Sequence, residues 1–119
     1  MSTSLSDEDA KLVTLARGAR LRAHAPHTGL AAGAAVRDVD GRTYAGATVE
    51  NTDPGLTTTA LRAAVVAAAS SGARGFEAAA VVTAGELGTH DLAVLAEFGS
   101  GVPVFVADPD GVLRETRSS

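Results

Sequence analysis

Two uninterrupted apolar runs, residues 78–82 and 102–107, constrain the fold of this chain more than any other feature of its sequence. Strands that are covered on both faces read as continuous apolar runs, whereas strands with one wet face alternate between apolar and polar residues. Other segments carry apolar residues at i, i+3, i+4 and i+7, the spacing of an amphipathic helix. Buried strands that alternate with helices predict an α/β fold with helices on the faces of a sheet.

The individual elements follow from local signals. A first helix is predicted over residues 7–22, because Ser6 and Asp9 resemble a capping box and helical spacing follows them. An Asp-Val-Asp-Gly turn between segments 32–37 and 42–49 predicts a β-hairpin. The other expected elements are a helix capped by Thr57 or Thr58 and stopped by Gly72, a strand at 78–82, a helix from Thr89 to Gly99, strands at 102–107 and 112–115, and a disordered tail at 116–119. Together they predict a three-layer α/β/α arrangement around a mixed, five-stranded sheet.

The length and the apolar residues bear on domain number and assembly. With 119 residues the chain is too short for two domains and a linker, so we expect a single domain over residues 1–119. Apolar residues make up 45% of the chain but aromatic residues only 3%, so alanine, valine and leucine must fill the core. Such a core buries little area per residue and gains from contact with a partner. We therefore expect a homo-oligomer, a dimer or a tetramer.

Charge and cysteine content exclude several classes of function. The formal net charge is -4 and the sole lysine is Lys11, with no basic cluster among aromatic residues, so no nucleic-acid partner is expected. The segment 1–9 is polar and acidic where a signal peptide needs a basic start and an apolar run. No apolar stretch is long enough to span a membrane, so we expect a cytoplasmic protein with no membrane partner. The absence of cysteine excludes disulfides and thiolate metal ligands.

Five short motifs follow one another along the chain. They are His24-Ala25-Pro26-His27-Thr28-Gly29, Gly33-Ala34-Ala35-Val36, Gly41-Arg42-Thr43-Tyr44-Ala45-Gly46, Val49-Glu50-Asn51 and the Leu-Ala-Glu-Phe-Gly that ends at Gly99. In this order they resemble the short, homotetrameric cytidine deaminases. In that family an Ala-Pro-Tyr-Ser segment precedes Val-Gly-Ala-Ala, and Asn-(Val/Ile)-Glu-Asn follows the hairpin. The resemblance extends up to Leu113 and implies the three-layer cytidine deaminase-like fold.

The same comparison implies that the zinc site has degenerated. The family begins its second helix with Cys-Ala-Glu-Arg and its third with Pro-Cys-x-x-Cys, and the glutamate moves protons without binding the metal. The corresponding ligand positions here are Thr59, Gly88 and Asp91, and the glutamate position is Leu61. A neutral hydroxyl and a glycine cannot replace two thiolates. We therefore expect no metal, no cofactor and no catalytic residue.

Two positions match the substrate-binding part of the family. The resemblance implies that Glu50 and Thr48 face the ribose hydroxyls, although Thr48 replaces an asparagine and has no amide. Leu30 stands where relatives place an aromatic residue against the pyrimidine, which removes stacking. The alternative is that Glu50 and Asn51 only satisfy backbone groups where the chain turns toward the second helix.

Threonines and histidines each allow two interpretations. Helix capping is the simpler explanation for Thr58, Thr59 and Thr89, and core packing is the simpler explanation for Leu61. The alternative is that two helix N-termini converge and bind an anion such as phosphate. For His24, His27 and His90 the choice is between solvated side chains and a rebuilt metal site.

These observations lead to three hypotheses of function. The leading one is a catalytically inactive, zinc-free cytidine deaminase-like protein, a pseudoenzyme that acts as a binding or oligomeric interaction module, alone or with an active paralogue. A nucleoside or an anion is its candidate ligand. The alternative is a nucleoside (cytidine or deoxycytidine) deaminase-superfamily hydrolase with residual or altered activity. The third is a scaffold that is retained only for its shape.

Overall fold

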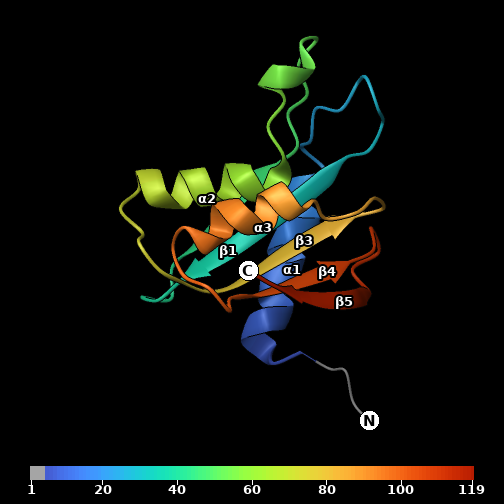
Figure 1. The fold of residues 1–119 in the computed structure, drawn as a ribbon. Helices are drawn as coiled ribbons and strands as arrows, with labels where there is room; N and C mark the ends of the chain where they lie inside the picture. The colour runs from blue at the N-terminus through green and yellow to red at the C-terminus, as the bar shows by residue number, and fades with distance from the viewer. Residues whose placement is uncertain (1–4) are drawn as a thin grey trace.

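The computed structural model describes residues 5–119, and its centre is a mixed sheet of five strands in the order β2-β1-β3-β4-β5 (Figure 1). Only β3 and β4 are parallel, and every other neighbouring pair is antiparallel. The strands are β1 (Ala32–Asp38), β2 (Thr43–Ala47), β3 (Phe76–Thr83), β4 (Pro103–Ala107) and β5 (Leu113–Ser118). Both continuous apolar runs are therefore central strands of the sheet, as the sequence predicted.

Helices cover both faces of the sheet. Helix α1 (Asp7–Arg20) lies on one face, while α2 (Ala60–Ser70) and α3 (Thr89–Ala96) lie side by side on the other (Figure 1). A short 3-10 turn, η1 (Pro54–Leu56), belongs to a segment that protrudes between β2 and α2. The expected three-layer α/β/α fold with a mixed five-stranded sheet is confirmed. Within residues 5–119, none of the helices has the length and apolar character needed to cross a bilayer.

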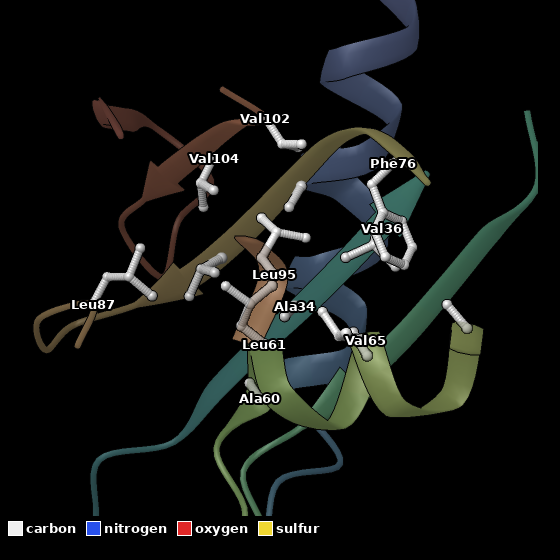
Figure 2. Close-up of a cluster of buried hydrophobic side chains, with 14 of the residues drawn as sticks. Ala34, Val36, Ala60, Leu61, Val65, Phe76, Leu87, Leu95, Val102 and Val104 are labelled. Carbon is white, nitrogen blue, oxygen red and sulfur yellow. The ribbon is translucent and has the colours of Figure 1, made fainter. Parts of the chain in front are cut away.

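The core consists of one buried cluster on each face of the sheet. The cluster under α1 is built from Leu12, Ala16 and the residues of the central strands that face them, mostly alanines together with Phe105. The larger cluster lies under α2 and α3 and includes Leu61, Leu95 and Phe76 (Figure 2). Leu61 is only 1% exposed, so the expectation that it packs in the core is confirmed.

The helix ends differ from the sequence predictions. Helix α1 ends at Arg20 rather than residue 22, and α3 ends at Ala96 rather than Gly99, because tight turns complete both segments. Helix α2 begins after Thr59, not after Thr57 or Thr58. The predicted cap at Thr89 is also wrong, because Gly88 holds the N-cap position and Thr89 is already helical.

The prediction of a disordered tail is wrong. Strand β5 continues through the tail, with Arg117 opposite Val104 and Ser118 opposite Pro103. The hydroxyl of Ser119 accepts a hydrogen bond from Val102 N at 3.0 Å. The polar residues of this segment concealed a strand because β5 lies at the sheet edge, where alternating polar residues face water.

The predicted capping box is half formed. Ser6 Oγ accepts a hydrogen bond from Asp9 N at 3.2 Å, so Ser6 is the N-cap of α1 as expected. The carboxylate of Asp9 instead accepts a hydrogen bond from Arg37 Nη2 at 3.0 Å, and Arg37 Nε donates to Glu77 at 3.1 Å. A side chain that was expected to cap a helix therefore anchors α1 to strand β1.

Two glycines allow the helices to approach the sheet closely. A Cβ atom on Gly33 of β1 would overlap the backbone of α1 at Ala16 O and Arg20 N. On Gly46 of β2, it would lie 2.5 Å from the backbone nitrogen of Ala64 in α2. Neither position can accept even a methyl group unless a helix moves.

We expect Gly33→Ala to destabilise the protein by about 1–3 kcal/mol, the usual cost of overpacking, or more if α1 is displaced. Gly18→Ala is the matched control, because Gly18 lies inside α1 with open space around its Cα. The free energy of unfolding of this control should rise by up to about 1 kcal/mol, because alanine has a better helix propensity than glycine. Chemical denaturation measures both changes, and equal midpoints for Gly33→Ala and the parent would contradict the packing argument.

Candidate functional site

Helices α2 and α3 begin next to each other, with Thr59 directly before α2 and Gly88 directly before α3. Neither residue makes a side-chain capping bond. Instead, Thr59 Oγ1 donates a hydrogen bond of 2.7 Å to Oδ1 of Asp91, which belongs to the first turn of α3. Thr59 therefore holds the N-cap position of α2 as expected, but its hydroxyl links the two helix starts instead of accepting from a backbone N–H of α2. The carboxylate of Asp91 also suits the positive end of the α3 dipole.

A cavity of about 180 Å³ opens beside this hydrogen bond. It brings together five of the positions singled out in the sequence, since Leu30, Thr48, Thr59, Leu61 and Asp91 all line it. Gly88 is not part of the lining. The other lining residues are Ala32, Ala60, Val81, Thr83, Gly85, Glu86 and Leu87.

Glu50 faces a neighbouring hollow of about 460 Å³ rather than this cavity. Its Oε1 accepts hydrogen bonds from the backbone nitrogens of His27 (2.8 Å) and Thr28 (3.2 Å), and its Oε2 accepts one from the Thr28 hydroxyl. The Thr28 hydroxyl, and then the backbone donors and nearby His27, lower the pKa of Glu50, whereas burial opposes the shift. Glu50 therefore holds the 25–29 loop, using oxygens that the resemblance assigns to a ribose.

Thr48 and Asn51 also bond to the backbone. Thr48 Oγ1 accepts from Ala32 N at 3.2 Å and lies 3.4 Å from Ala32 O. Asn51 Oδ1 accepts from Asp53 N at 2.9 Å. These contacts match the alternative interpretation, in which Glu50 and Asn51 accept hydrogen bonds from backbone groups. One detail differs from that interpretation: Glu50 bonds to the 25–29 loop and not to the turn toward α2. Ribose binding by Thr48 and Glu50 stays a prediction.

The residues at the implied zinc position do not fit zinc. Thr59 offers a neutral hydroxyl that is already bonded to Asp91, and Gly88 offers no side-chain donor. Structural and catalytic zinc sites use three or four strong donors from cysteine, histidine and carboxylate groups. Across residues 5–119, no three or more such side chains, the histidines included, lie close enough to hold a metal ion. Asp91 is the only charged donor of the implied set.

Sequence reasoning missed three contributors to this region. The hydrogen bond between Thr59 and Asp91 joins residues 32 positions apart, so no local sequence pattern predicts it. Glu86 lies in the loop before α3, where no motif marked it. Thr28 did carry a signal, because it stands where the related Ala-Pro-Tyr-Ser segment has a serine, and it keeps the hydroxyl that bonds Glu50.

Comparison with known proteins places this arrangement in a family. A family model described as cytidine deaminase-like matches residues 5–111. The chain belongs to the cytidine deaminase-like family. A cytidine deaminase from Sporosarcina psychrophila is 36% identical over 111 residues, which cover 89% of this chain and 82% of that protein.

Solved structures of relatives agree with this assignment. The cytidine deaminase from Burkholderia pseudomallei has a TM-score of 0.85 and 30% identity, covering 96% of this chain and 93% of its own. The cytidine deaminase from Mycobacterium tuberculosis has a TM-score of 0.76 and 30% identity, covering 93% and 91%. The family and fold implied by the sequence motifs are thus confirmed across nearly the whole chain.

We expect Glu50→Gln to lower the melting temperature at pH 7, because a neutral amide accepts weaker hydrogen bonds than a carboxylate. The lowered pKa of Glu50 fixes the pH dependence. Its stabilisation is fully present above the ordinary glutamate pKa of about 4.3 and is lost as pH falls through the lower folded value. The difference between parent and variant should therefore shrink below about pH 4.

Melting curves between pH 3 and pH 7 measure this effect. Glu97→Gln is the matched control, because Glu97 is exposed at the end of α3. It should change the melting temperature little at any pH. If Glu50→Gln and Glu97→Gln gave parallel curves, Glu50 would not hold the loop through its charge.

Proposed function

We propose that this cytidine deaminase-like protein carries no zinc, does not deaminate nucleosides and acts as a binding or oligomeric interaction module. The observation that carries the proposal is the 2.7 Å hydrogen bond between Thr59 and Asp91. It occupies two of the three positions that the resemblance assigns to metal ligands. The position of the proton-transferring glutamate is Leu61, which packs in the core under α2 (Figure 2).

The chemical consequence concerns both halves of the deamination reaction. Zinc would supply a hydroxide at neutral pH, because it lowers the pKa of its bound water to about 7. A glutamate would then move a proton to the departing amino group and the ring. Leu61 cannot transfer a proton, and Thr59 with Asp91 lacks the donors for tight zinc binding. The loss of general acid-base catalysis alone slows such reactions by about 10²–10⁴-fold.

We expect the purified protein to contain far less than one zinc per chain and to release no ammonia from cytidine or deoxycytidine. Elemental analysis and an ammonia assay measure the two outcomes. A Thr59→Cys, Gly88→Cys, Asp91→Cys triple variant is the control, since it should acquire zinc if these positions are equivalent to the family's ligands. One tightly bound zinc in the parent, or ammonia above background, would overturn the proposal.

A hydrolase with altered chemistry is the second candidate, and one observation favours it. A hydroxyl bonded to a carboxylate, as in Thr59 and Asp91, is part of the arrangement that activates nucleophiles in other enzymes. Asp91 orients this hydroxyl but is a poor acceptor for its proton compared with histidine, which favours the non-catalytic proposal. Nucleoside turnover by the parent that Thr59→Val abolishes would favour the hydrolase.

Self-association is the second part of the proposed function. Leu30, Val49 and Leu56 are between 51% and 64% exposed and belong to the 24–31 loop and the protruding segment that contains η1 (Figure 1). Both segments are joined through bridges at Val49, which pairs with His24 and Thr58. Small residues on the outer side of α2 would let a second copy approach closely. We infer that these surfaces bury each other in a dimer or tetramer.

Light scattering at micromolar concentration should give a mass near two or four times 11.9 kDa. Leu56→Asp should shift this mass toward that of one chain without lowering the melting temperature of the monomer, because Leu56 is 64% exposed. Val39→Asp is the matched control, because Val39 is 63% exposed at the opposite end of β1 from Leu30. A parent that stays at 11.9 kDa when concentrated would rule out self-association.

A further inference from the structure

In the described part of the chain, strand β5 is paired on one side alone. The strand order places it last in the sheet, next to β4 (Figure 1). Ser119 N donates to Val102 O at 3.0 Å, and Ser119 O accepts from Gly101 N at 3.1 Å, so the backbone of Ser119 faces β4. Backbone groups alternate between the two sides of an antiparallel strand. The N–H and C=O groups of Thr116 and Ser118 therefore point outward, and such an edge is a template for another strand.

The side chains of this edge carry charges of both signs. Glu115 and Arg117 lie on the same face of β5, because side chains two residues apart in a strand point the same way. They form an ion pair within the chain, with Arg117 Nη1 3.8 Å from Glu115 Oε1, and the two side chains are 33% and 39% exposed. Charges on edge strands usually prevent pairing with another chain. One residue of each sign instead disfavours some pairing registers and favours another.

Symmetry leaves few registers for antiparallel pairing of two β5 strands. Their outward backbone groups must face each other, so the two-fold axis passes beside Glu115, Thr116 or Arg117 when most of the strand overlaps. An axis at Glu115 sets two glutamates directly opposite each other, and an axis at Arg117 does the same with two arginines. Like charges in such positions destabilise a sheet. An axis at Thr116 sets Glu115 of each copy opposite Arg117 of the other.

The register centred on Thr116 also suits the backbone. At Thr116 the outward N–H and C=O groups of the two copies exchange two hydrogen bonds. Glu115 and Arg117 then form non-hydrogen-bonded pairs, in which opposite side chains come closest to each other. Pairs of opposite charge and pairs of threonines both stabilise neighbouring strands. Backbone direction, charge and two-fold symmetry therefore agree on one register, and the strand that fits it is β5 of a second copy.

We propose that β5 pairs with β5 of a second copy of this chain, antiparallel and centred on Thr116, so that two sheets join across a two-fold axis. The inference rests on the self-association in the proposed function, because it supplies a second contact between copies. It uses different residues, since the 24–31 loop and the segment that contains η1 lie away from β5 (Figure 1). Two different two-fold contacts on one chain can close into a tetramer, whereas either contact alone stops at a dimer.

Charge reversal on the full-length chain tests the pairing, with Leu56→Asp present throughout to remove the contact proposed for the loops. Analytical ultracentrifugation of Leu56→Asp alone should give a mass near two chains of 11.9 kDa. Adding Glu115→Arg or Arg117→Glu should weaken this dimer by about tenfold or more, because like charges then face each other. An equal mixture of these two variants should dimerise again, since each arginine faces a glutamate of the other variant. Neither variant keeps the internal ion pair, so this rescue can come only from contact between chains.

Two controls accompany this test. Glu115→Arg combined with Arg117→Glu in one chain should dimerise as tightly as Leu56→Asp alone, because opposite charges face each other again. Arg42→Glu, which precedes the strand at the opposite edge of the sheet, should leave the dimer unchanged.

Three results would overturn the inference. They are single charge reversals that stay dimeric, a mixture of them that stays at 11.9 kDa, and a mass of 11.9 kDa for Leu56→Asp at every concentration. The last result would leave the edge for a strand of a different protein. If Leu56→Asp did not change the mass of the parent while the edge variants behaved as described, the loop contact of the proposed function would be refuted and the β5 contact supported.

Discussion

The close approach of helix backbones to the sheet is the constraint on which the rest of this structure depends. Gly33 and Gly46 present no side chain where α1 and α2 cross the strands, and alanines such as Ala16 and Ala64 complete the contact. Because glycine and alanine occupy these contacts, the helices pack close to the sheet, and many short van der Waals contacts hold the layers together. Any added volume at these contacts displaces a whole helix. The low aromatic content of the chain agrees with this close packing.

The same contact determines where the candidate site lies. Because Gly46 seats α2 against β2, the first residues of α2 reach the position at which α3 also begins. The hydrogen bond from Thr59 to Asp91 then joins the two helix starts. Its contribution is modest, since a hydrogen bond to a charged group adds roughly 1.5–3 kcal/mol, whereas the buried cluster under both helices provides most of the cohesion. The buried cluster and this hydrogen bond together hold the starts of α2 and α3 side by side.

The sequence predicted those parts of the fold that depend on local pattern. Continuous apolar runs identified β3 and β4, the Ser6 signal identified the start of α1, and Asp38 to Gly41 identified the hairpin, where Asp38 accepts from Asp40 N and Arg42 N. What escaped prediction depends on partners distant in sequence. The polar tail forms strand β5 because it pairs with β4 at the edge of the sheet. Asp9 does not complete the capping box because its carboxylate accepts a hydrogen bond from Arg37 of β1. At the site, Thr59 and Leu61 could be singled out by resemblance, but the partner of Thr59 could be found only in three dimensions.

The two carboxylates singled out in this region, Glu50 and Asp91, differ in how the fold uses them. Glu50 accepts hydrogen bonds from the loop at residues 27 and 28, so its charge stabilises the loop that lines the neighbouring hollow. Among residues 5–119, the side chain of Asp91 accepts a hydrogen bond from Thr59 alone, and Asp91 lines the cavity. The distribution of partners therefore gives Glu50 a role in holding a loop, whereas Asp91 links two helix starts and retains acceptor capacity on its carboxylate. A molecule that entered the cavity would meet this carboxylate, so Asp91 is the first position to vary when binding is tested.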